Sequence, residues 1–460
     1  MNKSWARMIA ALFFVSAASF PAAAAGRIDF DGSILNSPGL GDALKPLSLA
    51  RLQAVPLAGG RRAPAVSWGG RDAADWAVLV YMNAKNNLAP YGYKNFKQME
   101  KVGSSSRVKI VVEFGLVAPN AVSQGGWRGT RRYLVEKSAD PAVITSPALS
   151  ESADTDMGDY HELISFVKWA KEKFPARHTM LVVWNHGSGW LESNSYVSVR
   201  GISYDDETGH HITTEQLGQA LAAVGGVDVY ASDACLMQMA EVDYQIKGGA
   251  QTIVGSEETE PGDGWTYDAF LSPLAANPSM GSEDVGRAAA QAYVSHYADG
   301  WSAVTQSAVR SSSVDGFAAL LDSWTSRLME TNQRALARSA RAQAVHFYYS
   351  DNIDVGDYVR LVAAGSPDEQ TKAQSQKLLD FLGSGLVIDN RTQGASFQNA
   401  RGLAVYLPAY RVDPAYMNLA WAKGGHWAQF AQWVADPNSY GDGADFPIAD
   451  RRAKNKVSRL

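Results

Sequence analysis

Cysteine is nearly absent from this 460-residue sequence, which contains only Cys235. A single cysteine excludes an intramolecular disulfide. The N-terminal segment indicates an exported protein. In such a protein a lone thiol adds no crosslink and is open to oxidation. Cys235 therefore predicts a reactive thiol or an intermolecular bridge. The alternative is a buried cysteine that packs as a small hydrophobic residue, which is common for free thiols.

An excess of positive charge and long apolar runs are also lacking. The 42 Lys and Arg residues and 47 Asp and Glu residues give a formal net charge of −5, so charge provides no basis for nucleic-acid binding. A membrane-spanning helix needs about 20 apolar residues, and no stretch beyond the N-terminal segment approaches that length without a charge. We therefore expect no nucleic-acid partner, no membrane span in the mature chain, and a monomer.

The residues that are present indicate a globular, exported protein. Hydrophobic residues make up 46% of the chain, enough to bury a sizeable core and to exclude wholesale disorder. Residues 1–25 have the pattern of a signal peptide, with Lys3 and Arg7 before an apolar run and small residues before Gly26. A membrane anchor is the alternative, but the run is shorter than the roughly 20 residues of a spanning helix. We expect a periplasmic or extracellular protein.

Composition shifts divide the remaining chain into four parts. Residues 26–72 contain eight glycines and four prolines, which predict an extension or pro-segment, with a strapped-down arm left open. Residues 73–275 alternate between strand-like and helix-like patterns and form the expected core. Residues 276–440 are richer in helical patterns and are expected to pack on that core. Residues 441–460 form a basic tail, which we interpret as a solvated end.

Short continuous apolar runs predict the strands of the core. They occupy residues 76–82, 108–114, 179–184, 227–230 and 252–255. Uninterrupted runs of this length are typical of strands buried on both faces, and amphipathic helical patterns lie between them. The sequence therefore predicts an α/β fold with a mainly parallel sheet covered by helices on both faces. One further run, at residues 403–408, predicts a strand contributed by the C-terminal region.

Two of the predicted strands lead directly into chemically distinctive residues. His186 and Gly187 follow the third run, and Cys235 follows the fourth. Catalytic groups in open α/β sheets gather beyond the carboxyl ends of the strands, so these side chains are expected to meet. A histidine or a helix N-terminus lowers the pKa of a thiol, and we expect Cys235 to lie where its strand gives way to a helix.

This arrangement suits nucleophilic catalysis by a thiol. His186 is placed to accept the thiol proton and to donate it to a leaving amine. The N–H groups of Gly187 and Cys235 are candidates for an oxyanion hole. Taken separately, the histidine is better explained as a hydrogen-bonded core residue and the glycine as part of a turn. Their joint occurrence with the single cysteine favours catalysis.

At these residues the sequence resembles the clostripain-like cysteine peptidases, which are related in fold to caspases and legumain. The resemblance extends over about residues 76–267 and returns in short segments. Its motifs are VLVYMN at 78–83, NNL at 86–88, MG at 157–158, WNHGSGW at 184–190, DACLM at 233–237, EPGDGW at 260–265 and GLAVYLP at 402–408. The resemblance implies a caspase-like fold and a cysteine endopeptidase with a His186–Cys235 dyad.

The resemblance also implies cleavage after basic residues, often Arg and less surely Lys. An acid two residues before the cysteine helps to hold the basic side chain in this family, and Asp233 has that position. A carboxylate there suits a guanidinium, which it binds bidentately. Asp263, between two glycines, is a candidate second acid. The alternatives are that Asp233 caps the next helix and that Asp263 is a solvated loop residue.

Processing and calcium are two further family properties. Members are often made as precursors cut between the His and Cys segments, and Arg200 is the candidate processing residue here. Some members require calcium, for which Asp205, Asp206 and Glu207 would offer oxygen ligands. Three adjacent acids more often form an exposed turn, and the alternating Asp/Asn pattern of a calcium loop is missing. We expect no required cofactor and leave calcium open.

The expected partners are protein or peptide substrates that carry basic residues. Two other functions remain open for the same fold. One is a non-catalytic binding protein, although both dyad residues are present. The other is an amidase or transpeptidase that uses the thiol on a different substrate.

Overall fold

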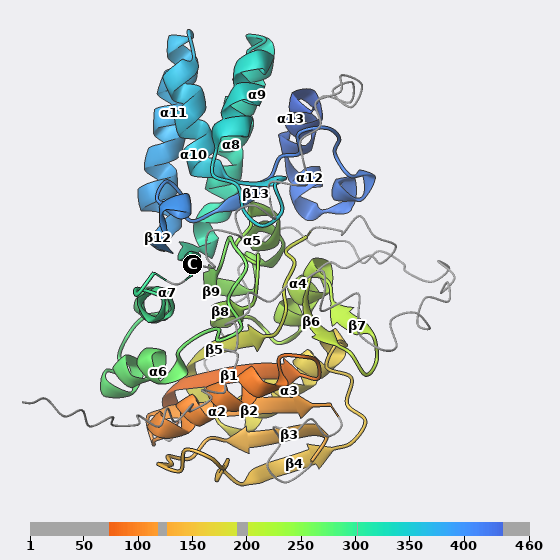
Figure 1. Cartoon of the computed structure of the whole chain (residues 1–460), viewed down its shortest axis with the longest axis vertical. Coiled ribbons are helices and arrows are strands. Elements are labelled where there is room, and N and C mark those ends of the chain that lie inside the picture. The colour runs from red at the N-terminus through yellow and green to blue at the C-terminus, as the bar shows by residue number, and fades with distance from the viewer. Residues whose placement is uncertain (1–72, 118–126, 191–200, 301, 436–460) are drawn as a thin grey trace, which may run out of the picture.

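The computed structural model describes residues 73–117, 127–190, 201–300 and 302–435 (Figure 1). The predicted signal peptide 1–25, the extension 26–72, the processing residue Arg200 and the basic tail 441–460 lie outside the described residues. Nothing in the structure therefore tests those four predictions.

A nine-stranded sheet forms the centre of the molecule, in the order β12-β10-β9-β8-β5-β1-β2-β3-β4 (Figure 1). Its five central strands run parallel to one another. They are β1 (Ala74–Ala84), β2 (Val108–Leu116), β5 (Ala176–Trp184), β8 (Val227–Asp233) and β9 (Ala250–Gly255). These are the five strands that the apolar runs predict, and all five are confirmed.

Antiparallel strands flank the parallel centre on both sides. β3 (Gly129–Leu134) and β4 (Ala148–Ser152) extend it beyond β2. β10 (Val304–Arg310) and β12 (Val387–Gln393) extend it beyond β9. The C-terminal region therefore contributes two strands to the sheet, as the predicted fold class requires.

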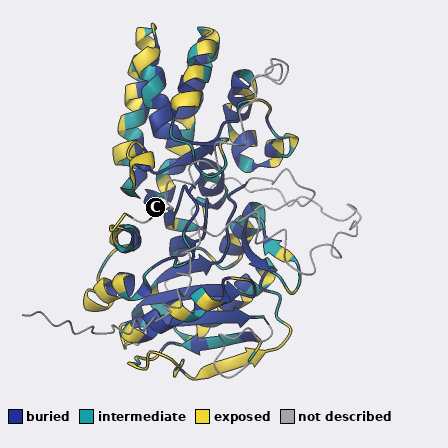
Figure 2. Cartoon of the chain, in the orientation of Figure 1, coloured by how far each residue is buried: buried dark blue, intermediate teal, exposed yellow. Residues whose placement is uncertain are grey.

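Two hydrophobic cores lie on the two faces of the sheet. Leu79 and Tyr81 of β1 belong to one core, while Val78 and Val80 belong to the other, because side chains alternate along a strand. Figure 2 shows the central strands buried and β4 exposed at the edge. Burial on both faces explains why the central strands are continuous apolar runs.

Helices cover both faces. The face that contains Leu79 is covered by α3 (Tyr160–Lys173), α4 (Thr214–Ala223) and α5 (Ala240–Ile246). The opposite face is covered by α2 (Ala89–Val102), α6 (Tyr267–Ala276) and α7 (Ser282–His296). Thr213 and Gln216 form the capping box that begins α4. The prediction of an α/β sheet covered on both faces is confirmed.

The remaining helices stand together at one end of the molecule (Figure 1). They are α8 (Val314–Glu330), α9 (Arg334–Gln343), α10 (Val355–Gly365), α11 (Glu369–Asp380), α12 (Ala420–Gly424) and α13 (Trp427–Val434). The late strand β13 (Ala404–Tyr406) is shorter than its apolar run and pairs with β11 (Asn352–Asp354) in a separate sheet. A small hairpin consists of β6 (Ile202–Asp205) and β7 (His210–Ile212). No described helix is both long and apolar enough to cross a membrane.

Candidate active site

The register of β5 and β8 brings His186 and Cys235 to the same edge of the sheet. Trp184 is aligned with Asp233 in this parallel pair, and the histidine and the cysteine each follow two residues later. The pairing continues past the strand ends, where Asn185 N donates to Asp233 O at 3.2 Å. The expectation that the two strands are neighbours is confirmed.

The loop after β5 packs directly against the backbone of the cysteine loop. A Cβ atom at Gly187 would lie 2.4 Å from the Cys235 carbonyl oxygen, a distance that no real side chain tolerates. Gly189 has a φ of 62°, and a Cβ atom there would lie 2.8 Å from the Leu236 carbonyl oxygen. Glycine at these two positions is what permits the histidine and cysteine loops to touch.

Cys235 is 3% exposed and its sulfur contacts the loop after β9. Its Sγ accepts a hydrogen bond from Glu260 N at 3.2 Å and donates one to Glu260 O at 3.9 Å. Burial raises the pKa of the Cys235 thiol to about 12, so the sulfur is protonated in this environment.

The expectation that Cys235 lies at a helix N-terminus is wrong. Helix α5 begins at Ala240, and the intervening chain turns at Leu236, whose φ is 63°. Leu236 N donates to Glu258 O at 3.1 Å, so the cysteine loop follows the neighbouring strand-end loop rather than entering a helix. The N–H that reaches the sulfur therefore comes from Glu260, whose position depends on tertiary structure.

His186 is 2% exposed, and its partner is an asparagine that sequence reasoning did not identify. His186 Nε2 lies 2.7 Å from Oδ1 of Asn87, in the loop between β1 and α2. Burial lowers the pKa of His186 to about 4, so the imidazole is neutral at ordinary pH. In the sequence, the NNL motif at 86–88 could have identified Asn87, because this motif follows a strand that ends at the same edge of the sheet.

A buried lysine fixes the loop that carries Asn87. Lys85 is 1% exposed and its Nζ lies 2.8 Å from Glu207 and 3.5 Å from Asp205. Asp205 Oδ2 also accepts the Met157 N–H at 2.9 Å. Asp205 is thus a buried structural group and not part of an exposed turn. The described residues contain no group of three or more His, Cys, Asp or Glu that could hold a metal ion.

Asp233 lies buried beneath the loop that precedes α6. Its Oδ1 accepts the Trp265 N–H at 3.3 Å and its Oδ2 accepts the Tyr267 hydroxyl at 2.9 Å. Burial raises the pKa of Asp233 to about 7, while hydrogen bonds from Glu260 and Tyr267 oppose that rise. The alternative that Asp233 caps the following helix is wrong, because its carboxyl oxygens accept hydrogen bonds from this loop.

Asp263, the candidate second acid, has a cationic partner already. Its Oδ1 lies 2.8 Å from Lys94 Nζ, and its Oδ2 lies 3.6 Å from His296 Nε2. A carboxylate neutralised by a lysine contributes less to binding a substrate cation. The structure therefore places Asp263 in an ion pair on the loop and not in the hydrogen-bonded group around Asp233.

The segments that flank the candidate processing residue are tied to each other. Gly187 forms a bridge with Ile202, and Ser188 N donates to Gly201 O at 3.0 Å. Gly201 N donates in turn to Ser188 Oγ at 3.1 Å. Arg200 itself lies outside the described residues.

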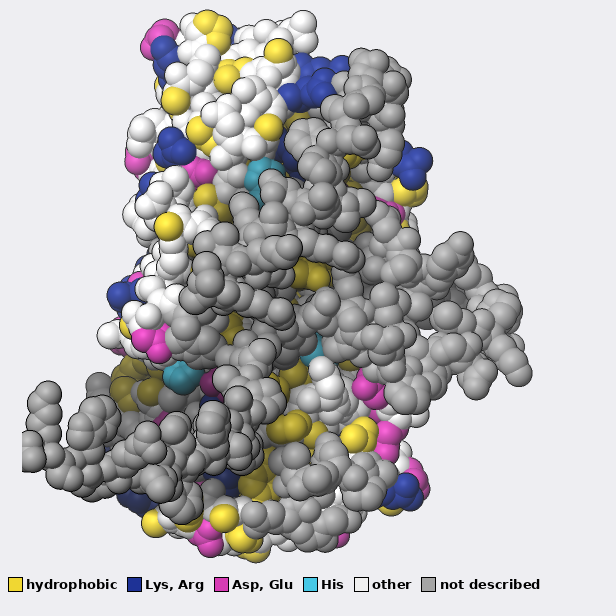
Figure 3. Space-filling view, viewed as in Figure 1, with side chains coloured by type: hydrophobic (Ala, Val, Ile, Leu, Met, Phe, Trp, Pro, Cys, Tyr) yellow, Lys and Arg dark blue, Asp and Glu magenta, His cyan; other side chains and the backbone are white. Residues whose placement is uncertain are grey.

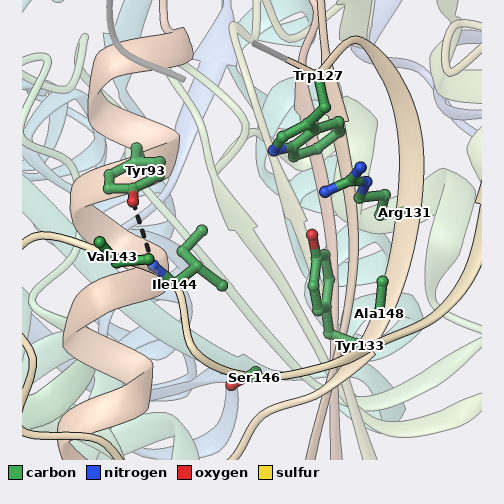
Figure 4. A pocket seen from close by; sticks show the side chains of 8 residues that line it. All are labelled: Tyr93, Trp127, Arg131, Tyr133, Val143, Ile144, Ser146 and Ala148. Atoms are coloured by element: carbon green, nitrogen blue, oxygen red, sulfur yellow. Dashed lines mark hydrogen bonds between the residues drawn. The ribbon is translucent and has the colours of Figure 1, made fainter. Parts of the chain in front are cut away.

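A separate pocket of about 160 Å³ lies near the far edge of the sheet, on β3 and the adjacent loop (Figure 4). Arg131 lies 4.4 Å from the Trp127 ring centroid there, and Ile144 N donates to Tyr93 Oη at 3.2 Å. β3 is the third strand away from β5, and none of the candidate site residues lines this pocket.

On the face shown in Figure 3, the described acidic and basic side chains are interspersed.

Comparisons with known proteins agree with this fold and site. The clostripain family model matches residues 80–382, which include His186 and Cys235. Clostripain from Hathewaya histolytica is 30% identical over 241 residues, and that match spans 45% of this chain and 43% of clostripain. The match thus covers less than half of that relative.

Two solved structures share the fold. A secreted C11 cysteine protease from Bacteroides thetaiotaomicron, in complex with an irreversible peptide inhibitor, is 18% identical with a TM-score of 0.59. The alignment covers 77% of this chain and 100% of that one. An inactive zymogen C11 protease from Parabacteroides distasonis is 20% identical with a TM-score of 0.55, over 76% and 98% of the two chains. The family match, the shared fold and the paired strand ends lead to one conclusion: this chain belongs to the clostripain family.

Proposed function

We propose that this chain is an exported cysteine endopeptidase that hydrolyses peptide bonds after Arg and, to a lesser extent, after Lys. The observation that carries the proposal is the convergence of His186, Cys235 and Asp233 at the aligned ends of β5 and β8. The thiol and the imidazole both come from the chain, so the chemistry requires no cofactor. The secreted relative from Bacteroides supports a location outside the cytoplasm, periplasmic or extracellular.

His186 acts first as a base. When Nε2–H donates to Asn87 Oδ1, Nδ1 is the basic nitrogen of the imidazole, and it takes the proton from the Cys235 thiol. The sulfur then attacks the carbonyl carbon of the substrate, and the N–H groups of Gly187 and Cys235 stabilise the oxygen that becomes negative. Because burial keeps the thiol and the imidazole neutral, the proton transfers as the sulfur attacks.

The reaction ends with hydrolysis of a thioester. His186 returns its proton to the leaving amine as the carbon–nitrogen bond breaks, and the acyl group stays on the sulfur. A water molecule then gives a proton to His186 and attacks the thioester carbonyl. The carbon–sulfur bond breaks, the acid leaves, and the thiol regains its proton from His186.

Substrate selection tests this proposal. We expect Asp233→Asn to lower kcat/KM for Arg substrates about 10–100-fold, because a charge-assisted bidentate contact is lost. Substrates with an uncharged residue at the cleaved position should change little. Fluorogenic peptides with Arg, Lys, Asn or Asp at that position provide the measurement, and Arg should exceed Lys because only a guanidinium binds bidentately.

The same panel separates the other candidate functions. Equal losses on Arg and uncharged substrates would show that Asp233 has a structural role only. Failure of the intact dyad to cleave any peptide would favour a binding protein. Products joined by new amide bonds would favour a transpeptidase.

We also propose that the enzyme cuts its own chain after Arg200. Ser188 and Gly201 hold the flanking segments together, so a cut between them would leave the sheet intact. Purified wild-type protein is expected to yield a fragment that begins at Gly201, whereas Cys235→Ala protein should stay whole in this segment. The measurement is N-terminal sequencing. Fully active protein with this segment uncut would show that the single chain is intrinsically active.

A further inference from the structure

Glu260, in the loop after β9, is an acid whose backbone contacts the nucleophile. Its backbone N and O both contact the Cys235 sulfur, at 3.2 and 3.9 Å. The residue is 5% exposed. Its position in the loop after β9 is thus set by the cysteine itself.

The side chain of Glu260 faces the Asp233 carboxyl. The two carboxyl groups are in hydrogen-bond contact, and each affects the pKa of the other. The Gln306 amide, with its nitrogen toward Glu260, donates to Oε1 at 3.3 Å. Glu260 Oε2 and the nearby Trp265 Nε1 complete no hydrogen bond within the described residues. The Trp265 indole is near enough to lower the pKa of Glu260, but Oε2, which is more than nine-tenths buried, forms no complete hydrogen bond in the described part of the chain.

No cation neutralises this pair in the described part of the chain. Burial is the main cause that raises the pKa of both groups, and no Lys, Arg or His contributes to either. Asp263 differs in this respect, because Lys94 lies 2.8 Å from its carboxylate. Two adjacent buried carboxyl groups cannot both ionise without a counter-ion, so they retain a proton.

A guanidinium meets the requirements of this pair. It carries a permanent positive charge and five N–H donors in a planar fork, enough to serve two carboxylates at once. Its charge replaces that of the retained proton. A lysine ammonium is a point charge with three donors and matches two planar acceptors less well.

We propose that Glu260, and not Asp263, is the second acid that binds the arginine side chain of the substrate, and that binding releases the proton shared with Asp233. The proposal rests on the proposed cleavage after Arg and names the specificity residue of that site. Glu260 here is a binding residue, since its carboxylate would contact the substrate guanidinium.

The first test compares substrates in a Glu260→Gln variant. The substitution is isosteric and leaves the backbone contacts to Cys235 in place. We expect kcat/KM for Arg substrates to fall about 10–100-fold through KM, and Lys and uncharged substrates to fall less. Glu258→Gln is the matched control, because Glu258 is buried in the same loop but its carboxyl accepts bonds from Thr259. A loss equal on all substrates would overturn the proposal, as would an Arg-selective loss in Asp263→Asn alone.

The second test does not depend on peptidase activity. Agmatine, a small guanidinium, is titrated calorimetrically into full-length Cys235→Ala protein near pH 7, in two buffers that differ in ionisation enthalpy. We expect release of about one proton on binding, because the cation replaces it, and no release in Cys235→Ala/Glu260→Gln. Binding without proton release, or no binding, would overturn the proposal. If the wild-type enzyme fails to cleave after Arg while agmatine still displaces a proton, the proposed function fails and the guanidinium site stands.

Discussion

Cys235→Ala is expected to abolish peptide hydrolysis while the chain remains folded. The sequence contains no second cysteine, so no other thiol can form the thioester. The substitution removes only one sulfur atom from a site that is 3% exposed. It also leaves the Glu260 N–H without its acceptor, which costs about 1–3 kcal/mol for a buried donor. The measurements are turnover of an Arg peptide and thermal unfolding of both proteins.

Alkylation provides the control for this result. Iodoacetamide should add one group to the wild-type chain and none to the variant, and the extent of labelling should follow the loss of activity. Because the thiol is buried and its pKa is raised to about 12, labelling of the protein in this state should be slow. Undiminished hydrolysis by Cys235→Ala protein would end the cysteine-peptidase proposal.

His186→Ala is expected to reduce kcat strongly. Proton transfer by a positioned base alone contributes roughly 10²–10⁴-fold to the rate. Thiol activation would be lost as well, because His186 is the base to which we assign the Cys235 proton. Single-turnover kinetics on an Arg peptide separate this chemical loss from any change in binding. Recovery of activity with added imidazole would support the assignment, and a loss confined to KM would contradict it.

The buried imidazole also predicts a pH dependence of stability. Burial lowers the pKa of His186 to about 4 in the folded chain, whereas a histidine in an unfolded chain has a pKa of about 6.5. The unfolded chain therefore binds more protons between these values, and the folded state loses stability as pH falls through that window. His186→Ala should flatten the dependence of the unfolding free energy on pH between about 6.5 and 4.

Asn87→Ala provides a graded comparison for His186. The Asn87 amide oxygen lies 2.7 Å from His186 Nε2 and orients the imidazole, so we treat Asn87 as a positioning residue. We expect a loss of kcat smaller than that of His186→Ala, with KM nearly unchanged. In the double variant Asn87→Ala should add nothing, because groups that act as a unit are not additive.

The sequence alone determined the five central strands and the placement of His186 and Cys235 at one edge of the sheet. Continuous apolar runs mark strands buried on both faces, and parallel strands place their carboxyl ends at one edge. Both are properties of short segments. The prediction of a helix N-terminus at Cys235 failed because the turn at Leu236 depends on bonds to the neighbouring strand-end loop.

Tertiary structure decided which other side chains enter the site. Asn87 reaches His186 from a loop 99 positions earlier in the chain, and the Glu260 backbone reaches the Cys235 sulfur from 25 positions later. No local pattern distinguishes Glu260 from Asp263, since both are acids in one loop. The structure separates them because Lys94 neutralises Asp263, whereas Glu260 is buried beside Asp233 and no cation among the described residues affects its pKa. Such differences arise from packing between elements distant in sequence, which is why only the folded chain reveals them.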